Sequence, residues 1–149
     1  MGIIWQYLDK RGATANALRD YGRMEFIISH TDDKVKAVHE KMGGVSSPQF
    51  DGMPHTHNPH AAEDRMAEGM DEISVLRERY REAVEFMAWF KPAWEELTED
   101  ERYVLECFYM GADGPAVSAV CERFQIERNS AYRRKNRALS KLSVMLYGK

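Results

Sequence analysis

The chain has 149 residues, of which 44% are hydrophobic and 30% charged, a balance that suits a water-soluble, helix-rich protein. It contains no apolar run long enough to span a membrane, and its start, MGIIWQYLDKRG, lacks the basic and apolar parts of a signal peptide. We therefore expect a cytoplasmic protein without membrane contact. Its two cysteines, Cys107 and Cys121, fall on predicted apolar helix faces and are expected to be reduced core thiols, although their spacing also permits a disulfide.

The net charge of −3 is unevenly distributed along the chain. Residues 122–149 contain eight Lys or Arg against two Glu, a net charge of +6, whereas residues 60–106 contain fourteen acids against six bases, a net charge of −8. This asymmetry predicts a basic C-terminal part that binds a polyanion and an acidic part that points away from it.

The first long helix is predicted from about residue 13 to residue 42, because apolar residues such as Leu18, Tyr21, Ile28 and Val35 recur at helical spacing. The polar run at residues 31–33 either interrupts this helix or is a polar turn within it.

Residues 43–60 are rich in Gly and Pro and are predicted to form a flexible linker. His55, His57 and His60 lie in this segment in a spacing that can hold nickel or zinc adventitiously. Pro59 and the lack of a Cys partner nearby make the run a poor metal cage, so we expect no dedicated metal site.

A second long helix is predicted from about residue 61 to residue 90, where apolar residues alternate by three and four as in a heptad seam. Pro92 is expected to end or kink it, and the aromatic residues Trp89, Phe90 and Trp94 are expected to join it to the C-terminal part. Residues 1–94 would then form a stalk, either an antiparallel helical hairpin or a coiled-coil unit that makes a homodimer.

Residues 95–149 are predicted to form three further helices, which together with the stalk give an all-α fold. Thr98 is the expected N-cap of the first, with Glu101 at the capping-box spacing. Gly111 and Gly114 are expected to end it, and Pro115 suits the start of the next. That second helix carries Val117, Val120, Cys121 and Phe124 on one face, residues 125–127 form a turn, and the third helix begins at about Asn129.

The third helix has two faces at about 100° per residue. Ala131, Ala138, Leu142 and Met145 share the apolar face, while the other face and its flanks carry basic, amide and hydroxyl side chains. Because Arg and Asn side chains best match guanine and adenine edges, and Ser, Arg and Lys bind phosphate, these residues predict a DNA interface rather than a merely solvated basic face. The candidate residues are Arg128, Asn129, Ser130, Arg133, Arg134, Asn136, Arg137 and Lys141, with Arg134 and Lys141 on the flank facing the phosphate backbone.

Three pieces carry a family resemblance: L-T-E-D-E-R-x-V-L from Leu97, V-C-x-x-F-x-I from Val120, and A-Y-R-R-x-x-R-A-L-x-K-L from Ala131. The segment resembles region four of bacterial sigma factors and related domains of small phage-encoded transcriptional regulators. This sequence departs from the family at two positions. Where Gln125 stands the family usually has Gly, because this turn position favours a left-handed backbone. Where Glu127 stands the family usually has Ser or Thr, as N-cap of the helix that reads DNA.

The resemblance implies a sequence-specific DNA-binding regulator of transcription, with RNA polymerase as a further partner. Nothing in the sequence corresponds to the region that opens promoter DNA, so a phage-type activator or sigma-like auxiliary factor is expected. The alternative is a protein-interaction or phage packaging-associated helix-turn-helix protein without base readout. The sequence contains no motif of an enzyme and none for a cofactor, so we expect neither catalytic residues nor a bound cofactor.

Overall fold

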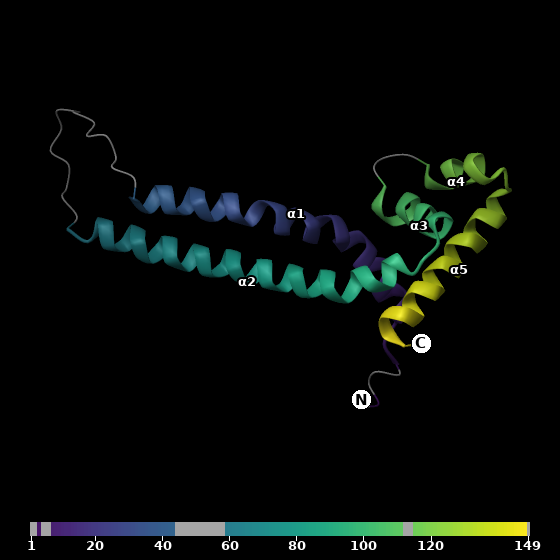
Figure 1. Cartoon of the computed structure of the whole chain (residues 1–149), viewed down its shortest axis with the longest axis horizontal. Helices are drawn as coiled ribbons and strands as arrows, with labels where there is room; N and C mark the ends of the chain where they lie inside the picture. Colours follow the sequence, from purple (N-terminus) through teal and green to yellow (C-terminus); the bar gives the residue numbers. More distant parts are fainter. Residues whose placement is uncertain (1–2, 4–6, 44–58, 112–114, 149) are drawn as a thin grey trace. The chain divides into compact units, whose positions relative to one another are not determined.

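The computed structural model describes residues 3, 7–43, 59–111 and 115–148, and the regular elements in these ranges are helices without strands (Figure 1). The predicted all-α fold is confirmed, and no helix in these ranges is long and apolar enough to cross a membrane. The elements are α1 (Lys10–Gly43), α2 (Ala61–Glu95), α3 (Glu99–Leu105), the π-helix η2 (Glu106–Met110), α4 (Ala116–Phe124) and α5 (Arg128–Tyr147). Most of the predicted linker, with His55 and His57, and the predicted helix end at Gly114 lie outside the described residues.

The chain divides into two compact units, and both long helices pass from one to the other. Unit 1 comprises residues 1–25 and 85–149, and unit 2 comprises residues 26–84. The sequence predicts a division after residue 94, but the first part of α1 and the last part of α2 group with the C-terminal helices. The reason is the apolar core that these segments share with α5.

The core of unit 1 is aromatic at its centre. Tyr21 of α1 packs on Phe90 of α2 with 5.4 Å between ring centroids, and Phe90 stacks on Trp94 at 5.8 Å. Trp89 is partly exposed, and its indole N–H donates to the Leu146 carbonyl oxygen of α5 at 3.4 Å. The buried residues of this core are Ala17, Leu18, Phe90, Ala93, Trp94, Leu97, Leu105, Ala138, Leu139 and Leu142.

Two positions expected to disturb the long helices do not end them. α2 continues through Pro92 to Glu95, because Ala93 and Trp94 are buried in the core and their packing offsets the missing backbone hydrogen bond. α1 continues through residues 31–33, where Thr31 is buried and its hydroxyl donates to the Ile27 carbonyl oxygen at 2.5 Å. The polar run is therefore a turn within one helix.

Within unit 2, the second part of α1 and the first part of α2 lie side by side (Figure 1). Met42 near the end of α1 packs against Gly69 near the start of α2, where an added Cβ would collide with the Met42 side chain. The buried apolar residues described in this unit are few: Val38, Ile73 and Ala83. Unit 2 therefore has a thin core.

Candidate nucleic-acid interface

A second core cluster holds the helix-turn-helix together. It consists of the buried Val104 of α3, Val120 of α4 and Ala131 of α5. Partly buried side chains surround it, among them Ile126 of the turn, which therefore points inward. Because each helix contributes one small or β-branched residue, α4 and α5 pack closely against the preceding helical segment.

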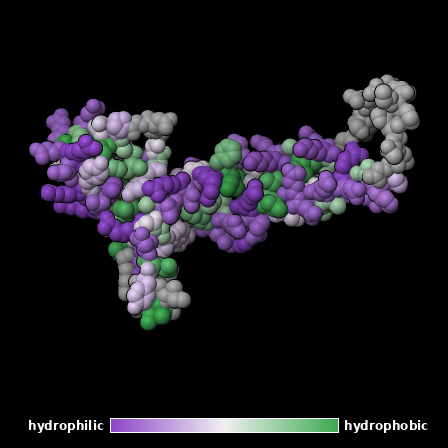
Figure 2. Space-filling view, turned by 180° about the vertical axis from the view of Figure 1, so that it is seen from behind, coloured by the Kyte–Doolittle hydropathy of each residue, from purple (hydrophilic) through white to green (hydrophobic). Residues whose placement is uncertain are grey.

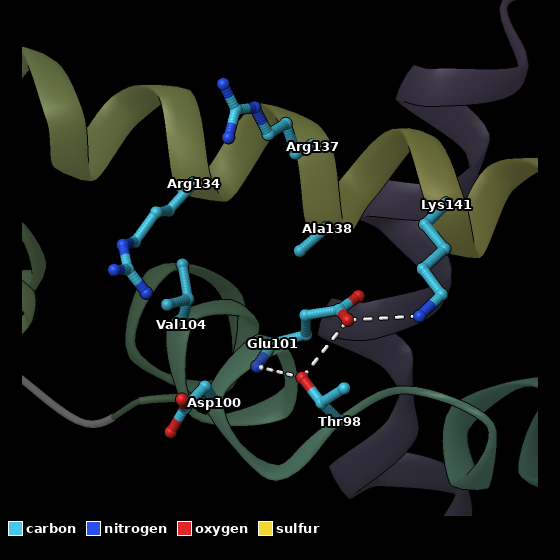
Figure 3. Close-up of a pocket in the computed structure, with 8 residues that line it drawn as sticks. All are labelled: Thr98, Asp100, Glu101, Val104, Arg134, Arg137, Ala138 and Lys141. Atoms are coloured by element: carbon cyan, nitrogen blue, oxygen red, sulfur yellow. Dashed lines mark hydrogen bonds and ion pairs between the residues drawn. The ribbon is translucent and has the colours of Figure 1, made fainter.

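The start of α3 is fixed by a capping arrangement (Figure 3). The Glu101 backbone N–H donates to the Thr98 Oγ1 at 3.2 Å, and the Thr98 hydroxyl donates to the Glu101 Oε1 at 3.1 Å. The predicted N-cap and its partner are thus confirmed. At its other end α3 passes into the π-helix and stops at Gly111.

The turn between α4 and α5 has the backbone that the resemblance implies. Gln125 has φ 53° and ψ 51°, in the left-handed region, although it is not glycine. Glu127 is the N-cap of α5 with an extended backbone, and its side chain makes no capping hydrogen bond. At both positions where the sequence departs from the family pattern, the backbone therefore has the conformation expected there. The side chain is less favourable than the family's residue, for the left-handed turn at Gln125 and for helix capping at Glu127.

The two faces of α5 lie as predicted. Ala131, Ala138 and Leu142 are buried, as is Leu139 beside them, while Met145 of the same face is half-buried. Ser143 is an addition that the sequence does not predict; it is buried and its hydroxyl has no hydrogen-bond partner in the described structure. In the C-terminal half of α5 the buried face joins the core of unit 1 through Ala138, Leu139 and Leu142. In the N-terminal half the opposite, polar face remains exposed.

The open face carries most of the predicted DNA-binding residues. Arg128, Asn129, Arg133, Asn136 and Arg137 are exposed, and Ser130 is half-buried. Within the described structure, the side chains of Asn129, Arg133, Asn136 and Arg137 form no hydrogen bond, ion pair or ring contact. Their donors and acceptors are therefore available to an external partner.

Arg134 and Lys141 are exposed but are already in contact with other residues. The Arg134 guanidinium lies over the Phe124 ring, 4.4 Å from its centroid, and the Lys141 Nζ is 3.0 Å from the Glu101 Oε1. Figure 3 shows both side chains reaching toward α3 while Arg137 points away from it. With Thr98, Asp100, Val104 and Ala138, these residues line a groove of about 360 Å³ between α3 and α5.

Further residues near α5 join the candidate interface, although sequence reasoning does not single them out. Ser118 of α4 is exposed and lines a second groove with Arg128; its position after Pro115, in the first turn of a helix, is the signal that could identify it. Lys135 lies over the Tyr132 ring at 5.5 Å, and Arg123 lies over the Tyr103 ring at 4.1 Å. Arg123, Arg134 and Lys135 thus each lie over an aromatic ring of the described structure, whereas Arg133 and Arg137 do not.

A third groove in unit 1, beside the π-helix, is lined by phenols. Burial raises the pKa of Tyr21 and of Tyr109, and the carboxylate of Glu25 further raises that of Tyr21. Both hydroxyls are therefore neutral at physiological pH. The Arg19 guanidinium lies over the Tyr109 ring at 5.4 Å.

Metal-binding side chains do not gather within the described ranges, where no group of three or more His, Cys, Asp or Glu side chains could hold a metal ion. His60, the described member of the histidine run, has its Nδ1 3.4 Å from the Glu63 Oε2. Cys107 and Cys121 are free thiols, both half-buried.

The geometry of the site is thus a helix-turn-helix with one exposed polar face, on which four side chains make no hydrogen bond, ion pair or ring contact with other described residues. Comparison of the chain with protein-family models, with curated proteins and with solved structures gives no match. The functional interpretation accordingly depends on the side chains of α5 and their surroundings.

Proposed function

We propose that the protein is a sequence-specific DNA-binding regulator of transcription that reads the major groove with the first half of α5. The observation that carries this proposal is the free polar face of α5. Four side chains on it, Asn129, Arg133, Asn136 and Arg137, are without intramolecular partners in the described structure. Arg and Asn are thus concentrated on one exposed face. A helix face that is only solvated would not require these particular side chains, since any polar residue would serve.

The chemistry of this face matches base edges. An Arg side chain can donate two hydrogen bonds to the O6 and N7 of guanine, and an Asn side chain can pair with the N6 and N7 of adenine. An α-helix with its side chains is about 10–12 Å wide, which fits the major groove of B-DNA. In helix-turn-helix proteins the second helix enters the groove with its N-terminal residues, and this is the part of α5 that is open.

Phosphate contacts would come from the edges of the same surface. Ser118 and Arg128, together with Glu122, line a groove between α4 and the start of α5, where a hydroxyl and a guanidinium can bind one DNA strand. Arg134 lies on the opposite flank of α5 and keeps its guanidinium at the surface while it stacks on Phe124.

The regulatory class is proposed from the resemblance to sigma-factor region four. A phage-type activator or an auxiliary factor that also contacts RNA polymerase fits this resemblance. The competing interpretation, a protein-interaction or packaging-associated helix-turn-helix protein, requires that α5 bind no particular DNA sequence, so base selectivity distinguishes the two.

The test begins with selection of bound sequences from random duplex DNA by the full chain. Arg133→Ala is then expected to weaken binding to the selected duplex by roughly 1–3 kcal/mol and to relax the preference at one base position. Arg79→Ala is the matched control, because it removes the same charge from an exposed position on α2 and should leave the preference intact. No enrichment of any sequence, with Arg133→Ala binding as the native protein does, would favour the interaction-protein function.

A homodimer formed through unit 2 is the second part of the proposal. Met66, Met70, Tyr80 and Val84 are between 39% and 59% exposed, and at about 100° per residue they lie within one sector of α2. Figure 2 shows hydrophobic residues interspersed among hydrophilic ones on the surface of the two long helices. Because the core of unit 2 is thin, a second copy that covers this stripe would add apolar burial that the hairpin lacks.

A further inference from the structure

One ion pair joins the acidic start of α3 to the basic helix α5. The Glu101 carboxylate accepts a hydrogen bond from the Lys141 Nζ at 3.0 Å and another from the Thr98 hydroxyl at 3.1 Å (Figure 3). The side chain of Glu101 is 26% exposed and that of Lys141 is 46% exposed. In the unbound protein, therefore, the ammonium group that the sequence predicts as a phosphate contact already has an anionic partner.

Glu101 is well fixed for this role. It lies in the first turn of α3, where the helix dipole favours a carboxylate, and its backbone N–H donates to Thr98. Lys141, by contrast, is a long side chain whose ammonium group can turn to another anion. The carboxylate is thus the fixed member of the pair and the ammonium is the mobile one.

We infer that Glu101 competes with DNA phosphate for Lys141 and so lowers the affinity of the protein for DNA of every sequence. The inference rests on the proposed function. A phosphate that approaches Lys141 must either displace the Glu101 carboxylate or lie beside it, and two negative charges at that distance repel. Because phosphate contacts carry no sequence information, the loss of affinity is the same for all duplexes, and base discrimination by Arg133 is unaffected.

The two flank residues accordingly differ in how they meet DNA. Arg134 stacks on an uncharged ring, so its charge stays available to a phosphate. Lys141 is neutralised by a carboxylate, so in the native protein it releases few counterions from DNA and adds little to the salt dependence of binding.

The experiment measures binding of the full chain to a selected duplex and to a random duplex across a range of salt concentrations. Glu101→Gln should tighten binding to both duplexes by about three- to tenfold at low salt, and steepen the slope of log K against log salt by about 0.9. Glu99→Gln is the matched control, since it removes one exposed carboxylate from the same helical turn without touching Lys141. The gain should disappear in Glu101→Gln combined with Lys141→Gln.

Three outcomes would overturn the inference while leaving DNA binding intact. They are unchanged binding by Glu101→Gln, an equal gain from Glu99→Gln, and a slope made shallower by about 0.9 by Lys141→Gln alone, which would mean that Lys141 already contacts phosphate. Failure of the native chain to bind any duplex would instead overturn the proposed function, and this inference with it. Thermal unfolding of each variant verifies that it is folded, and Glu101→Gln retains the backbone N–H that donates to Thr98.

Discussion

Gln125 is the one non-glycine residue with a positive φ in the described parts of the chain. A residue with a Cβ pays roughly 1 kcal/mol for this left-handed conformation, which glycine adopts freely. Gln125→Gly should therefore stabilise the protein by up to about 1 kcal/mol, measured as a shift of the denaturant midpoint at constant slope.

The control for that substitution introduces glycine where the backbone is right-handed. Ser118 is exposed in α4, on the N-terminal side of the turn, and Ser118→Gly should destabilise the protein by roughly 0.5–1 kcal/mol. If both glycine variants lose stability, the left-handed turn is not strained in the native protein.

The contact between Arg134 and Phe124 changes what is expected of an Arg134 substitution. From its position on the helix face it is expected to be exposed and unimportant for folding, and it is indeed exposed. Its guanidinium nevertheless covers the Phe124 ring, so Arg134→Ala should cost about 0.5–1 kcal/mol of stability in addition to the proposed phosphate contact. Arg133→Ala, which removes an unstacked arginine next to it, should leave the unfolding midpoint unchanged, and equal losses for the two variants would contradict the stacking contribution.

Residue roles were predictable where they depend on near neighbours in the sequence. The Thr98 cap and the buried face of α5 follow from residues within a few positions of one another, whereas the left-handed backbone at Gln125 was implied by the family resemblance. The pairs Arg134–Phe124 and Lys141–Glu101 were not predictable, because their members are brought together by the packing of α5 on other helices.

At the level of whole helices, the approximate limits of the α-helices follow from apolar spacing, whereas the π-helix η2 was not predicted and helix continuity depends on packing. Pro92 has the same local effect on the backbone in any sequence, but here the buried side chains of Ala93 and Trp94 keep α2 helical to Glu95. The periodicity of apolar residues likewise could not predict that the first part of α1 and the last part of α2 belong to unit 1, because this grouping depends on which aromatic rings are in contact.

Gly69 offers a test of helix-on-helix packing in unit 2. In an exposed helix, Gly→Ala stabilises by roughly 1 kcal/mol through helix propensity alone. Here the added methyl group would meet the side chain of Met42, so Gly69→Ala should give little or no gain in stability. In a Met42→Ala background the obstacle is gone, and the same substitution should then recover most of that gain. Thermal unfolding of the native chain, the two single variants and the double variant measures the coupling between the two substitutions. Additive changes in unfolding free energy would show that Gly69 and Met42 are not in contact.

For the whole molecule, the proposed homodimer predicts a concentration-dependent mass. Met70→Glu places a charge within the apolar stripe of α2 and should raise the dimer dissociation constant at least about tenfold, a cost of about 1.4 kcal/mol. Val75 is a matched control, because it is also apolar and exposed, but lies on a different side of the same helix.

Sedimentation equilibrium of the native chain, Met70→Glu and Val75→Glu decides the matter. Val75→Glu should associate as the native chain does. A native chain that remains a monomer at high micromolar concentration, with the same thermal midpoint at every dilution, would refute the dimer.

The aromatic core of unit 1 also provides an intrinsic fluorescence probe of unfolding. Trp89 and Trp94 belong to unit 1, and residues 26–84 contain no tryptophan at all. Indole fluorescence therefore records the melting of unit 1 alone, while the far-ultraviolet circular dichroism of the long helices records both units. Curves that coincide would mean that α1 and α2 transmit cooperativity along their length; curves that separate would mean that the thin hairpin melts while the aromatic core is still intact.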